Sequence, residues 1–478
     1  MRNVADRELV RAKIVCTIGP ASMRPEALAA MKEAGMDVAR LNLSHGDFEA
    51  HRRVAEDVRD IGSVAIMVDL PGPKIRIGRV DGSVKLVPGD RVHFTTRDVL
   101  GNSDELSVSH PGLPLEVSKG GSIYINDGLI EVKVVSIDES LEGFTGRMVS
   151  GGEVTSFKGV NAPGARLSMR PPTEVDLKGI AFGVEFCDWF AASFVRERGD
   201  VEGVKKAIEE AGGDQPVISK IEHREAVENI DEIVEASDGV MVARGDLGIE
   251  MPSWEVPLIQ KRIIGRCNEA GKPVIVATQM LESMVVNPRP TRAEASDVAN
   301  AILDGADAVM LSGETAVGLF PVEAVKVMNM ITQTVEEKAP RVHSERMMEG
   351  SIPDVIGQLA SRAARAVEPA AIIVVTRSGF SARMVSKHRP RTPILSVARS
   401  PEVNRKARLY WGVEPLDVEW ADDRDELLVR AVRRSVEAGY LARGDSVMIV
   451  SGSTLEAPGG TSSLEILSVE DILEHAGA

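Results

Sequence analysis

Short apolar runs recur along most of the chain, and helical periodicity follows nearly all of them. The runs are mostly continuous rather than alternating, which is typical of parallel strands that are covered on both faces. Residues 223–236 illustrate a helical segment, with Val227, Ile230, Ile233 and Val234 on one face. The eight predicted strands are residues 13–19, 38–42, 65–70, 189–193, 216–222, 239–245, 273–279 and 308–313.

These strand–helix units predict a closed (β/α)8 TIM barrel of the α/β class. An open doubly wound sheet is the structural alternative, and the even spacing of the units favours closure. The barrel is expected to comprise residues 1–70 and 171–340. After residue 340, helical and strand patterns alternate again, which predicts a C-terminal open α/β domain over residues 341–478.

The spacing of the predicted strands is interrupted once, by more than a hundred residues between the third and the fourth. This stretch shows alternation, glycine-centred turns and no long amphipathic helix, which predicts a small antiparallel β-barrel domain over residues 71–170. An insert on a strand–helix loop lies over the face where barrel active sites are found, so we expect it to act as a lid.

Composition narrows the class of protein. A chain of 478 residues with 43% hydrophobic and 27% charged residues is typical of a globular protein with two or three domains. The net charge of -16 argues against nucleic-acid binding, which needs a basic surface. No apolar run is long enough to cross a membrane, and the N-terminus lacks the apolar stretch of a signal peptide. Isolated cysteines without CxxC spacing predict reduced thiols in a cytoplasmic protein, and no histidine pattern supports structural zinc.

Charged side chains stand where the predicted fifth and sixth strands end. Lys220 and Glu222 close one apolar run, and Asp246 follows the next. Burying such groups is costly unless they pair or hold a metal. One interpretation is a structural ion pair that caps the strands. The same polarity at three consecutive strand ends favours instead a site for a divalent cation and a phosphoryl oxygen.

Other strand ends add polar residues that can converge on the same face, because catalytic residues of barrels lie at the C-terminal ends of strands. Arg40, Arg76 and Lys220 supply positive charge that suits phosphate oxygens, and carboxylates supply hard oxygen ligands for Mg²⁺. A glycine turn at residues 245–248 can present free backbone N–H groups to an anion. The remaining candidates are Asn42, Ser44, His45, Asp69, Lys74, Ser193, Thr278, Ser312 and Glu314.

Long motifs resemble the signatures of the pyruvate kinase family, in order along nearly the whole chain. They are KIVCTIGPAS, ARLNLSHG, FKGVNAPG, ISKIE, MVARGDLGIE, GKPVIVATQMLESM and RPTRAEASDVANAILDGADAVMLSGETA. The resemblance implies a glycolytic enzyme that moves a phosphoryl group from phosphoenolpyruvate to ADP, giving pyruvate and ATP. It further implies Mg²⁺ as the cofactor, with Mn²⁺ as a substitute, and a homotetramer.

The resemblance also implies roles for individual residues. Lys220 would stabilise the phosphoryl group during its transfer, and Arg40 would bind the same group. Glu222 and Asp246 would bind Mg²⁺. The substrate carboxylate would meet backbone N–H groups at residues 245–246. The other substrate-binding positions are Ser193, Gly245 and Thr278. The enolate would be protonated near Thr278, with a water chain at Ser312 as the alternative route. The nucleotide pocket would be lined by Pro20, Asn42, His45, Arg76 and Lys158.

Two positions depart from the family pattern. Many members have Glu in place of Lys74 and require K⁺, which they bind at positions matching Asn42, Ser44, Asp69 and the carbonyl of Leu70. We hypothesise that the Lys74 ammonium replaces this cation, so that K⁺ is not required. The alternative is that Lys74 points to solvent and the site still binds K⁺. The second departure is His223, which follows the metal-binding Glu222 where Asn is usual; it either alters the hydrogen bonding around Glu222 or only begins a helix.

A loop in the C-terminal domain resembles the family's allosteric site for phosphorylated effectors. Its candidate residues are Thr376, Ser378, Gly379 and Ser381, and residues 451–463 would form a neighbouring loop. The alternative is that these hydroxyls only cap the following helix. Two other functions were considered for the whole chain: a metal-dependent aldolase acting on phosphoenolpyruvate or pyruvate, and a non-catalytic regulatory relative. The regulatory alternative conflicts with the presence of Lys220, Arg40 and both carboxylates.

Overall fold

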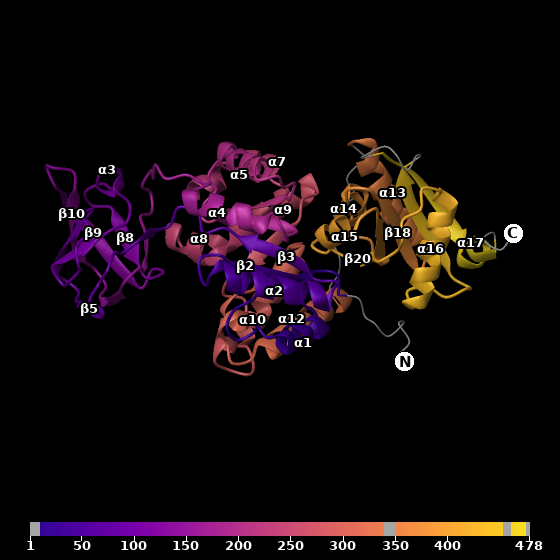
Figure 1. The fold of residues 1–478 in the computed structure, drawn as a ribbon, viewed down its shortest axis with the longest axis horizontal. Coiled ribbons are helices and arrows are strands. Elements are labelled where there is room, and N and C mark those ends of the chain that lie inside the picture. The colour runs from indigo at the N-terminus through magenta and orange to yellow at the C-terminus, as the bar shows by residue number, and fades with distance from the viewer. Residues whose placement is uncertain (1–9, 339–349, 453–459, 475–478) are drawn as a thin grey trace.

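Three groups of elements lie in a row in the computed structural model, which describes residues 10–338, 350–452 and 460–474 (Figure 1). The barrel is in the middle, the inserted β domain is at one end and the C-terminal α/β domain is at the other. This arrangement confirms the predicted fold class. The predicted boundary at residues 340 and 341 lies outside the described residues.

The central sheet is closed, with the strand order β1-β17-β16-β15-β14-β13-β3-β2 and parallel pairing throughout. Closure excludes the open-sheet alternative. Nearly every strand residue is buried, as continuous apolar runs require. The strands are β1 (Lys13–Thr17), β2 (Val38–Asn42), β3 (Ala65–Asp69), β13 (Trp189–Ala192), β14 (Val217–Ile221), β15 (Gly239–Ala243), β16 (Val274–Ala277) and β17 (Ala308–Leu311).

Helices surround this barrel, and one prediction about them was wrong. Residues 223–236 form two helices, α6 (Arg224–Glu228) and α7 (Ile230–Ala236), separated at Asn229. The Asn229 side chain donates to the Arg196 carbonyl at 3.0 Å, which ties the junction of the two helices to the loop after β13. The other helices are α1 (Pro25–Ala34), α2 (Phe48–Ile61), α4 (Glu174–Gly183), α5 (Arg198–Glu210), α8 (Arg244–Glu250), α9 (Val256–Ala270), the 3-10 helix η2 (Glu282–Val285), α10 (Arg292–Leu303), α11 (Gly313–Ala316) and α12 (Pro321–Lys338).

The insert is a curled sheet with the order β4-β12-β8-β9-β10-β6-β7. It is antiparallel at every pair except β6 with β7, so the prediction of a purely antiparallel domain missed one parallel pair. An isolated bridge between Ile77 and Val108 joins its two edges, and a stacked Phe94–Phe144 pair fills its core. Its elements are β4 (Ile75–Arg76), β5 (Ser83–Leu86), β6 (Arg91–Thr95), β7 (Glu105–Ser107), α3 (Leu113–Glu116), β8 (Ser122–Ile125), β9 (Ile130–Ile137), β10 (Gly143–Met148), β11 (Gly152–Thr155) and β12 (Gly159–Asn161).

The C-terminal domain is an open sheet with the order β20-β19-β18-β21-β22, in which only β22 is antiparallel. None of the helices in the described part of the chain is long and apolar enough to cross a membrane. The elements are α13 (Ile352–Val367), β18 (Ala371–Thr376), α14 (Phe380–Lys387), β19 (Ile394–Ala398), α15 (Pro401–Ala407), β20 (Val413–Leu416), α16 (Arg424–Glu437), β21 (Ser446–Gly452), β22 (Thr461–Ser468) and α17 (Val469–Glu474).

A buried set of charges joins the C-terminal domain to the N-terminal face of the barrel. Lys13, at the start of β1, lies 2.8 Å from Glu414 of β20 and 3.8 Å from Asp37. Arg408 lies 2.7 Å from Glu414. Burial alone would raise the pKa of Glu414, but Lys13 and Arg408 lower it to about 2. Ionised Glu414 therefore stabilises the contact between the two domains.

We predict that Glu414→Gln destabilises the folded protein by about 3 kcal/mol near neutral pH, because it leaves two buried cations short of a partner. A depressed folded pKa gives stability that is present above the unfolded value of 4.5 and is lost as pH falls toward about 2. The difference in thermal midpoint between wild type and variant should therefore be constant from about pH 8 to 5 and shrink below. Differential scanning fluorimetry across pH checks this, and a difference that grows on acidification contradicts it.

Candidate active site

Four side chains meet at the C-terminal ends of β2, β3, β13 and β14. Asp69, which ends β3, accepts from Arg40 Nε at 2.7 Å and from Lys220 Nζ at 3.2 Å. Lys220 also donates to Ser193 Oγ at 2.7 Å, and Ser193 donates to the Leu70 carbonyl at 2.7 Å. Neighbouring parallel strands end together, so their last residues converge. The structure therefore brings these four predicted strand-end residues into contact.

Mutual attraction keeps these buried groups charged. Burial opposes ionisation of Asp69, but Arg40 and Lys220 outweigh it and hold the pKa of Asp69 below its usual value. Burial likewise disfavours the Lys220 ammonium, but Asp69 and Glu222 raise the pKa of Lys220 above its ordinary value. Lys220 is therefore a fixed positive charge at any physiological pH.

Two carboxylates next to this cluster suit a divalent cation. Glu222 accepts from the Phe194 backbone N–H at 2.7 Å and lies 3.0 Å from Lys220 Nζ. Burial raises the pKa of Glu222 despite Lys220, and the negative charge of Asp246 adds to that rise. A cation between Glu222 and Asp246 would relieve this repulsion. No group of three or more His, Cys, Asp or Glu clusters in the described ranges, and a pair of carboxylates suits an ion such as Mg²⁺ that also binds substrate oxygens.

The segment after β15 differs from the predicted glycine turn. Residues Arg244–Glu250 form α8, and the Gly245 N–H donates to Thr278 Oγ1 at 2.7 Å, so it is not free. Thr278 adopts a left-handed backbone conformation, with φ of 68°, and its hydroxyl also donates to the Ala277 carbonyl at 2.6 Å. The structure thus brings Gly245, Asp246 and Thr278 together, with the hydroxyl of Thr278 already engaged.

Ser312 lies at the end of β17 with a buried hydroxyl that has no hydrogen-bond partner in the described part of the chain. Its backbone N–H donates to Glu314 Oε2 at 2.7 Å, and the other Glu314 oxygen accepts from the Leu281 N–H at 2.9 Å. Glu314 is fully buried and ties two strand-end loops together. The Ser312 hydroxyl is the kind of buried polar group that an ordered water satisfies.

The residues predicted to line the nucleotide pocket come from the barrel and the insert. Asn42 Oδ1 accepts from the Ser44 N–H at 3.1 Å. Burial lowers the pKa of His45, and the nearby charges of Arg76, Lys74 and Arg40 lower it further. His45 is therefore neutral at physiological pH and lies in a positive field that favours an anionic ligand.

Arg76 ends β4 of the insert, and Lys158 directly precedes β12, the strand that pairs with β4. Gly159 pairs with Arg76 across β12 and β4, and Arg76 Nη1 donates to the Phe157 carbonyl at 3.0 Å. Lys158 is half-buried, whereas Pro20, on the barrel, is exposed. The insert thus carries two cations close together next to the linker that joins it to the barrel.

Lys74 lies in the linker to the insert and is turned toward carboxylates. Its Nζ is 3.9 Å from Asp127 and 4.0 Å from Asp246, and its side chain is only 25% exposed. These recorded contacts differ from the predicted one, because they involve none of Asn42, Ser44, Asp69 or the Leu70 carbonyl. The charge of Lys74 nevertheless reaches the site, and the alternative of a solvent-directed Lys74 does not fit this burial.

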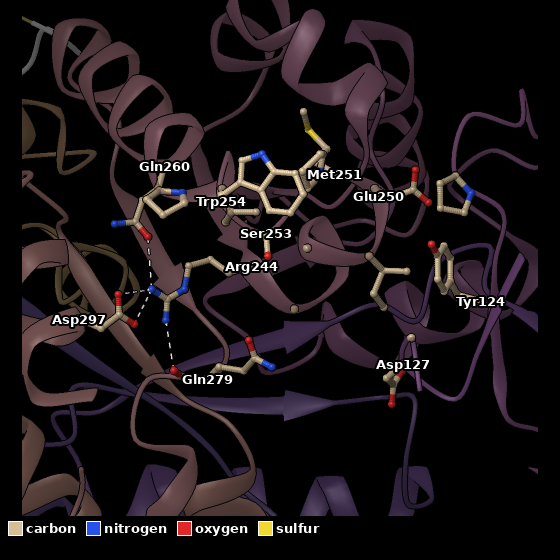
Figure 2. Close-up of a pocket in the computed structure, with 18 of the residues that line it drawn as sticks. Tyr124, Asp127, Arg244, Glu250, Met251, Ser253, Trp254, Gln260, Gln279 and Asp297 are labelled. Atoms are coloured by element: carbon tan, nitrogen blue, oxygen red, sulfur yellow. Dashed lines mark hydrogen bonds and ion pairs between the residues drawn. The ribbon is translucent and has the colours of Figure 1, made fainter. Parts of the chain in front are cut away.

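A cavity of about 1150 Å³ adjoins the site between the barrel and the insert, and Gly245 lines it. Figure 2 shows Tyr124 and Asp127 of the insert on one side, with Trp254 and Arg244 across from them. Arg244 donates to Asp297 at 2.8 Å and to the Thr278 carbonyl at 2.8 Å. Its positive charge is therefore already paired with a carboxylate of the cavity wall.

Two contributors to the site were missed in the sequence analysis. Thr17, the last residue of β1, accepts from Arg40 Nη1 at 2.8 Å and donates to the Leu311 carbonyl at 3.0 Å. Its place at a strand end was an available signal. Phe194 contributes only its backbone N–H, in a left-handed conformation with φ of 59°, and no side-chain pattern indicates such a role.

The predicted effector residues form a tight turn between β18 and α14. Thr376 Oγ1 accepts from the Gly379 N–H at 3.0 Å, and Gly379 has a φ of 83°. Ser381 and Thr461 share a hydrogen bond of 2.5 Å between their hydroxyls, while Ser378 is exposed. The Thr376 bond closes the turn before α14 and caps none of the N–H groups of that helix, so it decides neither for an effector site nor for the capping alternative. Part of the neighbouring loop, residues 453–459, lies outside the described residues.

Comparisons with known proteins agree with this geometry. A family model described as "Pyruvate kinase, barrel domain" matches residues 9–325, and one described as "Pyruvate kinase, alpha/beta domain" matches residues 354–467. The curated pyruvate kinases of Bacillus licheniformis and Geobacillus stearothermophilus are each 44% identical over 475 residues, covering 97% of this chain and 81% of theirs. The pyruvate kinase of Staphylococcus aureus (strain MRSA252) is 43% identical over 472 residues, covering 96% of this chain and 81% of that one.

We predict that Asp69→Asn destabilises the folded protein by about 3–5 kcal/mol at pH 7, because Arg40 and Lys220 lose their shared buried counter-charge. Urea unfolding gives the difference in midpoint. Asp98→Asn is the matched control, since it breaks an exposed pair with Arg79 and should cost at most about 1 kcal/mol.

The pH dependence adds a second check on Asp69. Its folded pKa lies below the unfolded value of 3.8, so its stabilisation is present above pH 3.8 and is lost as pH falls through the folded pKa. Equal midpoints for wild type and Asp69→Asn at pH 7 would show that Asp69 does not hold the cluster together.

Proposed function

The chain belongs to the pyruvate kinase family, and from this premise we propose which residues carry its reaction and which cations that reaction needs. The enzyme moves a phosphoryl group from phosphoenolpyruvate to ADP, which yields pyruvate and ATP. The observation that carries the assignment of residues is the joined cluster of Arg40, Asp69, Lys220 and Glu222 at the strand ends. The aldolase alternative has no need of the insert, and the family match spans the insert as well as the barrel.

Lys220 and Arg40 neutralise the phosphoryl group during transfer. Phosphoryl transfer depends on positioning and on charge neutralisation more than on covalent chemistry. Both cations are held by Asp69, so neither side chain has to reorganise when the phosphoryl group arrives. Glu222 and Asp246 would hold Mg²⁺ or Mn²⁺, and the ion would supply positive charge that neutralises the oxygens of the substrate.

The end of β16 and the start of α8 bind and protonate the rest of the substrate. The carboxylate of phosphoenolpyruvate lies against the backbone N–H of Asp246 and, once the Thr278 hydroxyl turns away from the Ala277 carbonyl, accepts from that hydroxyl as well. Ser193 orients Lys220 through their 2.7 Å contact. The proton that converts the enolate to pyruvate arrives from the side of Thr278, through water held at the unpartnered hydroxyl of Ser312.

The nucleotide binds between the barrel and the insert. The positive field around the neutral His45 favours the phosphates of ADP, and Arg76 and Lys158 approach them from the insert. Asn42 and Pro20 complete the barrel side of this pocket. The insert, residues 71–170, acts as the lid over the barrel of residues 1–70 and 171–340.

The regulatory and assembly proposals rest on the family resemblance. A phosphorylated effector would bind at residues 376–381 of the C-terminal domain, residues 341–478, where Ser378 is exposed beside the first turn of α14. The enzyme would act as a homotetramer in the cytoplasm and bind neither nucleic acid nor membrane.

The reaction proceeds without K⁺, in our proposal, because the chain supplies that charge itself. Asp69 would be one of the oxygen ligands of K⁺, and it is already neutralised by Arg40 and Lys220. Lys74 adds a fixed ammonium beside Asp246 and Asp127. A monovalent cation at Asp69 would face Arg40 and Lys220, which both contact that carboxylate, while Lys74 adds positive charge from the side of Asp246.

Steady-state pyruvate formation from phosphoenolpyruvate and ADP, with Mg²⁺ and with either Na⁺ or K⁺ at matched ionic strength, tests both parts of the proposal. Equal rates in the two salts support the reaction and its independence of K⁺. A rate found only in K⁺ keeps the reaction and rejects the role of Lys74. No rate in either salt, with sugar phosphates and nucleotides added, overturns the assignment of activity.

We predict that Lys74→Glu makes the rate depend on K⁺, because it removes a fixed cation and adds a carboxylate ligand at the same place. In Na⁺ the variant should lose about tenfold or more in kcat, and K⁺ should restore most of that loss. Lys74→Gln is the control, which removes the cation without creating the ligand and should not be rescued by K⁺. Equal activity of Lys74→Glu in both salts contradicts the prediction.

A further inference from the structure

His223 contacts two segments next to the proposed metal ligands: the Phe194 loop, which binds Glu222, and helix α8, which carries Asp246. It directly follows Glu222, and its ring lies against the Phe194 ring with centroids 5.4 Å apart. The Phe194 N–H is the group that holds Glu222 Oε2, at 2.7 Å. The position of the His223 ring therefore bears on the loop that orients the Glu222 carboxylate.

The second contact of His223 is with the helix that carries Asp246. Its Nδ1 lies 3.4 Å from Glu250 Oε2, and Glu250 is the last residue of α8. Residues four apart lie on one side of a helix, so Glu250 stands directly below Asp246. Fixing Glu250 consequently fixes the rotation of the helix face that presents Asp246.

Glu250 has few other attachments. It is 7% exposed, and its Oε1 has no hydrogen-bond partner in the described part of the chain. Glu250 also lines the cavity, as Figure 2 shows, on the wall that Tyr124 shares. A buried carboxylate with one oxygen that lacks a hydrogen bond lowers the stability of the fold. The presence of such a group in a native structure therefore calls for an explanation, such as a role in function. At its other end α8 is held by the Gly245–Thr278 bond.

We propose that His223 and Glu250 form a clamp that sets the separation of the Glu222 and Asp246 carboxylates, which makes both of them positioning residues for the divalent cation. The proposal rests on the proposed assignment of Glu222 and Asp246 as the metal ligands. Residues that orient metal ligands typically change metal affinity by about 10–100-fold when they are replaced. The clamp acts on affinity for the ion rather than on the phosphoryl transfer itself.

Binding of Mn²⁺ to the metal-free full-length protein, followed by the electron paramagnetic resonance signal of free Mn²⁺, tests the clamp without reference to activity. His223→Ala and Glu250→Ala should each raise the Kd by about tenfold. The double variant should be no weaker than the weaker single one, because either substitution already opens the clamp. His223→Gln keeps a side-chain N–H donor that can face Glu250 in place of the imidazole. It should therefore bind Mn²⁺ more tightly than His223→Ala does.

A kinetic readout separates positioning from catalysis. The Mg²⁺ concentration for half-maximal rate should rise by about tenfold in His223→Ala, while kcat at saturating Mg²⁺ stays within about threefold of wild type. The matched control is His388→Ala, which breaks a histidine–carboxylate pair of 2.8 Å with Asp354 in the C-terminal domain. It should leave Mn²⁺ affinity unchanged.

Two outcomes overturn the clamp. One is a Kd for Mn²⁺ within about twofold of wild type in folded His223→Ala, and the other is a double variant whose Kd rises by the product of the two single-variant factors. Glu222→Gln distinguishes this from failure of the proposed site. If Glu222→Gln also binds Mn²⁺ normally, the assignment of the metal ligands is wrong. If only Glu222→Gln loses Mn²⁺, the ligands stand and the clamp is rejected. Should His223→Ala not fold, Glu250→Gln replaces it, since it keeps the shape of the side chain.

Discussion

The whole active site depends on one buried carboxylate, Asp69, which neutralises two cations at once. Arg40 and Lys220 come from different strands, and each reaches one oxygen of Asp69. Without that shared partner, Arg40 would lose its buried counter-charge and Lys220 would keep only Glu222, at a cost of about 3–5 kcal/mol. With it, both cations are held in position before a phosphate arrives, which is the arrangement that electrostatic catalysis requires.

The shared partner also explains why the neighbouring acids behave differently. Asp69 receives both cations, which lower its pKa, whereas the pKa of Glu222 rises because of its burial and, in addition, because of repulsion from Asp246, with Lys220 opposing the rise. A divalent ion between Glu222 and Asp246 would offset both the burial cost and the repulsion, which is a reason for this part of the site to bind a metal.

The strand pattern was sufficient to predict the barrel, because continuous apolar runs and strand-end polar residues follow directly from burial on both faces. The same reasoning located Lys220, Glu222 and Asp246. It failed where backbone geometry decides. The apolar periodicity carries no signal for the break at Asn229, and the roles of the Phe194 and Gly245 N–H groups depend on left-handed backbone at Phe194 and Thr278, which no side-chain pattern encodes. Thr17 was predictable in principle, since it ends a strand like the others.

Both ends of the barrel bury charges, yet only one end is suited to chemistry. At the N-terminal end, Lys13 and Arg408 face Glu414 and Asp37, and these four formal charges sum to zero across two domains. At the other end, Arg40, Lys220 and Lys74 face Asp69, Glu222 and Asp246, and a cavity lies beside them. The formal charges of both sets sum to zero, so net charge does not distinguish the two ends. The difference is access: the first set is enclosed between two domains and holds them together, whereas the second lies next to a cavity that a charged ligand can enter.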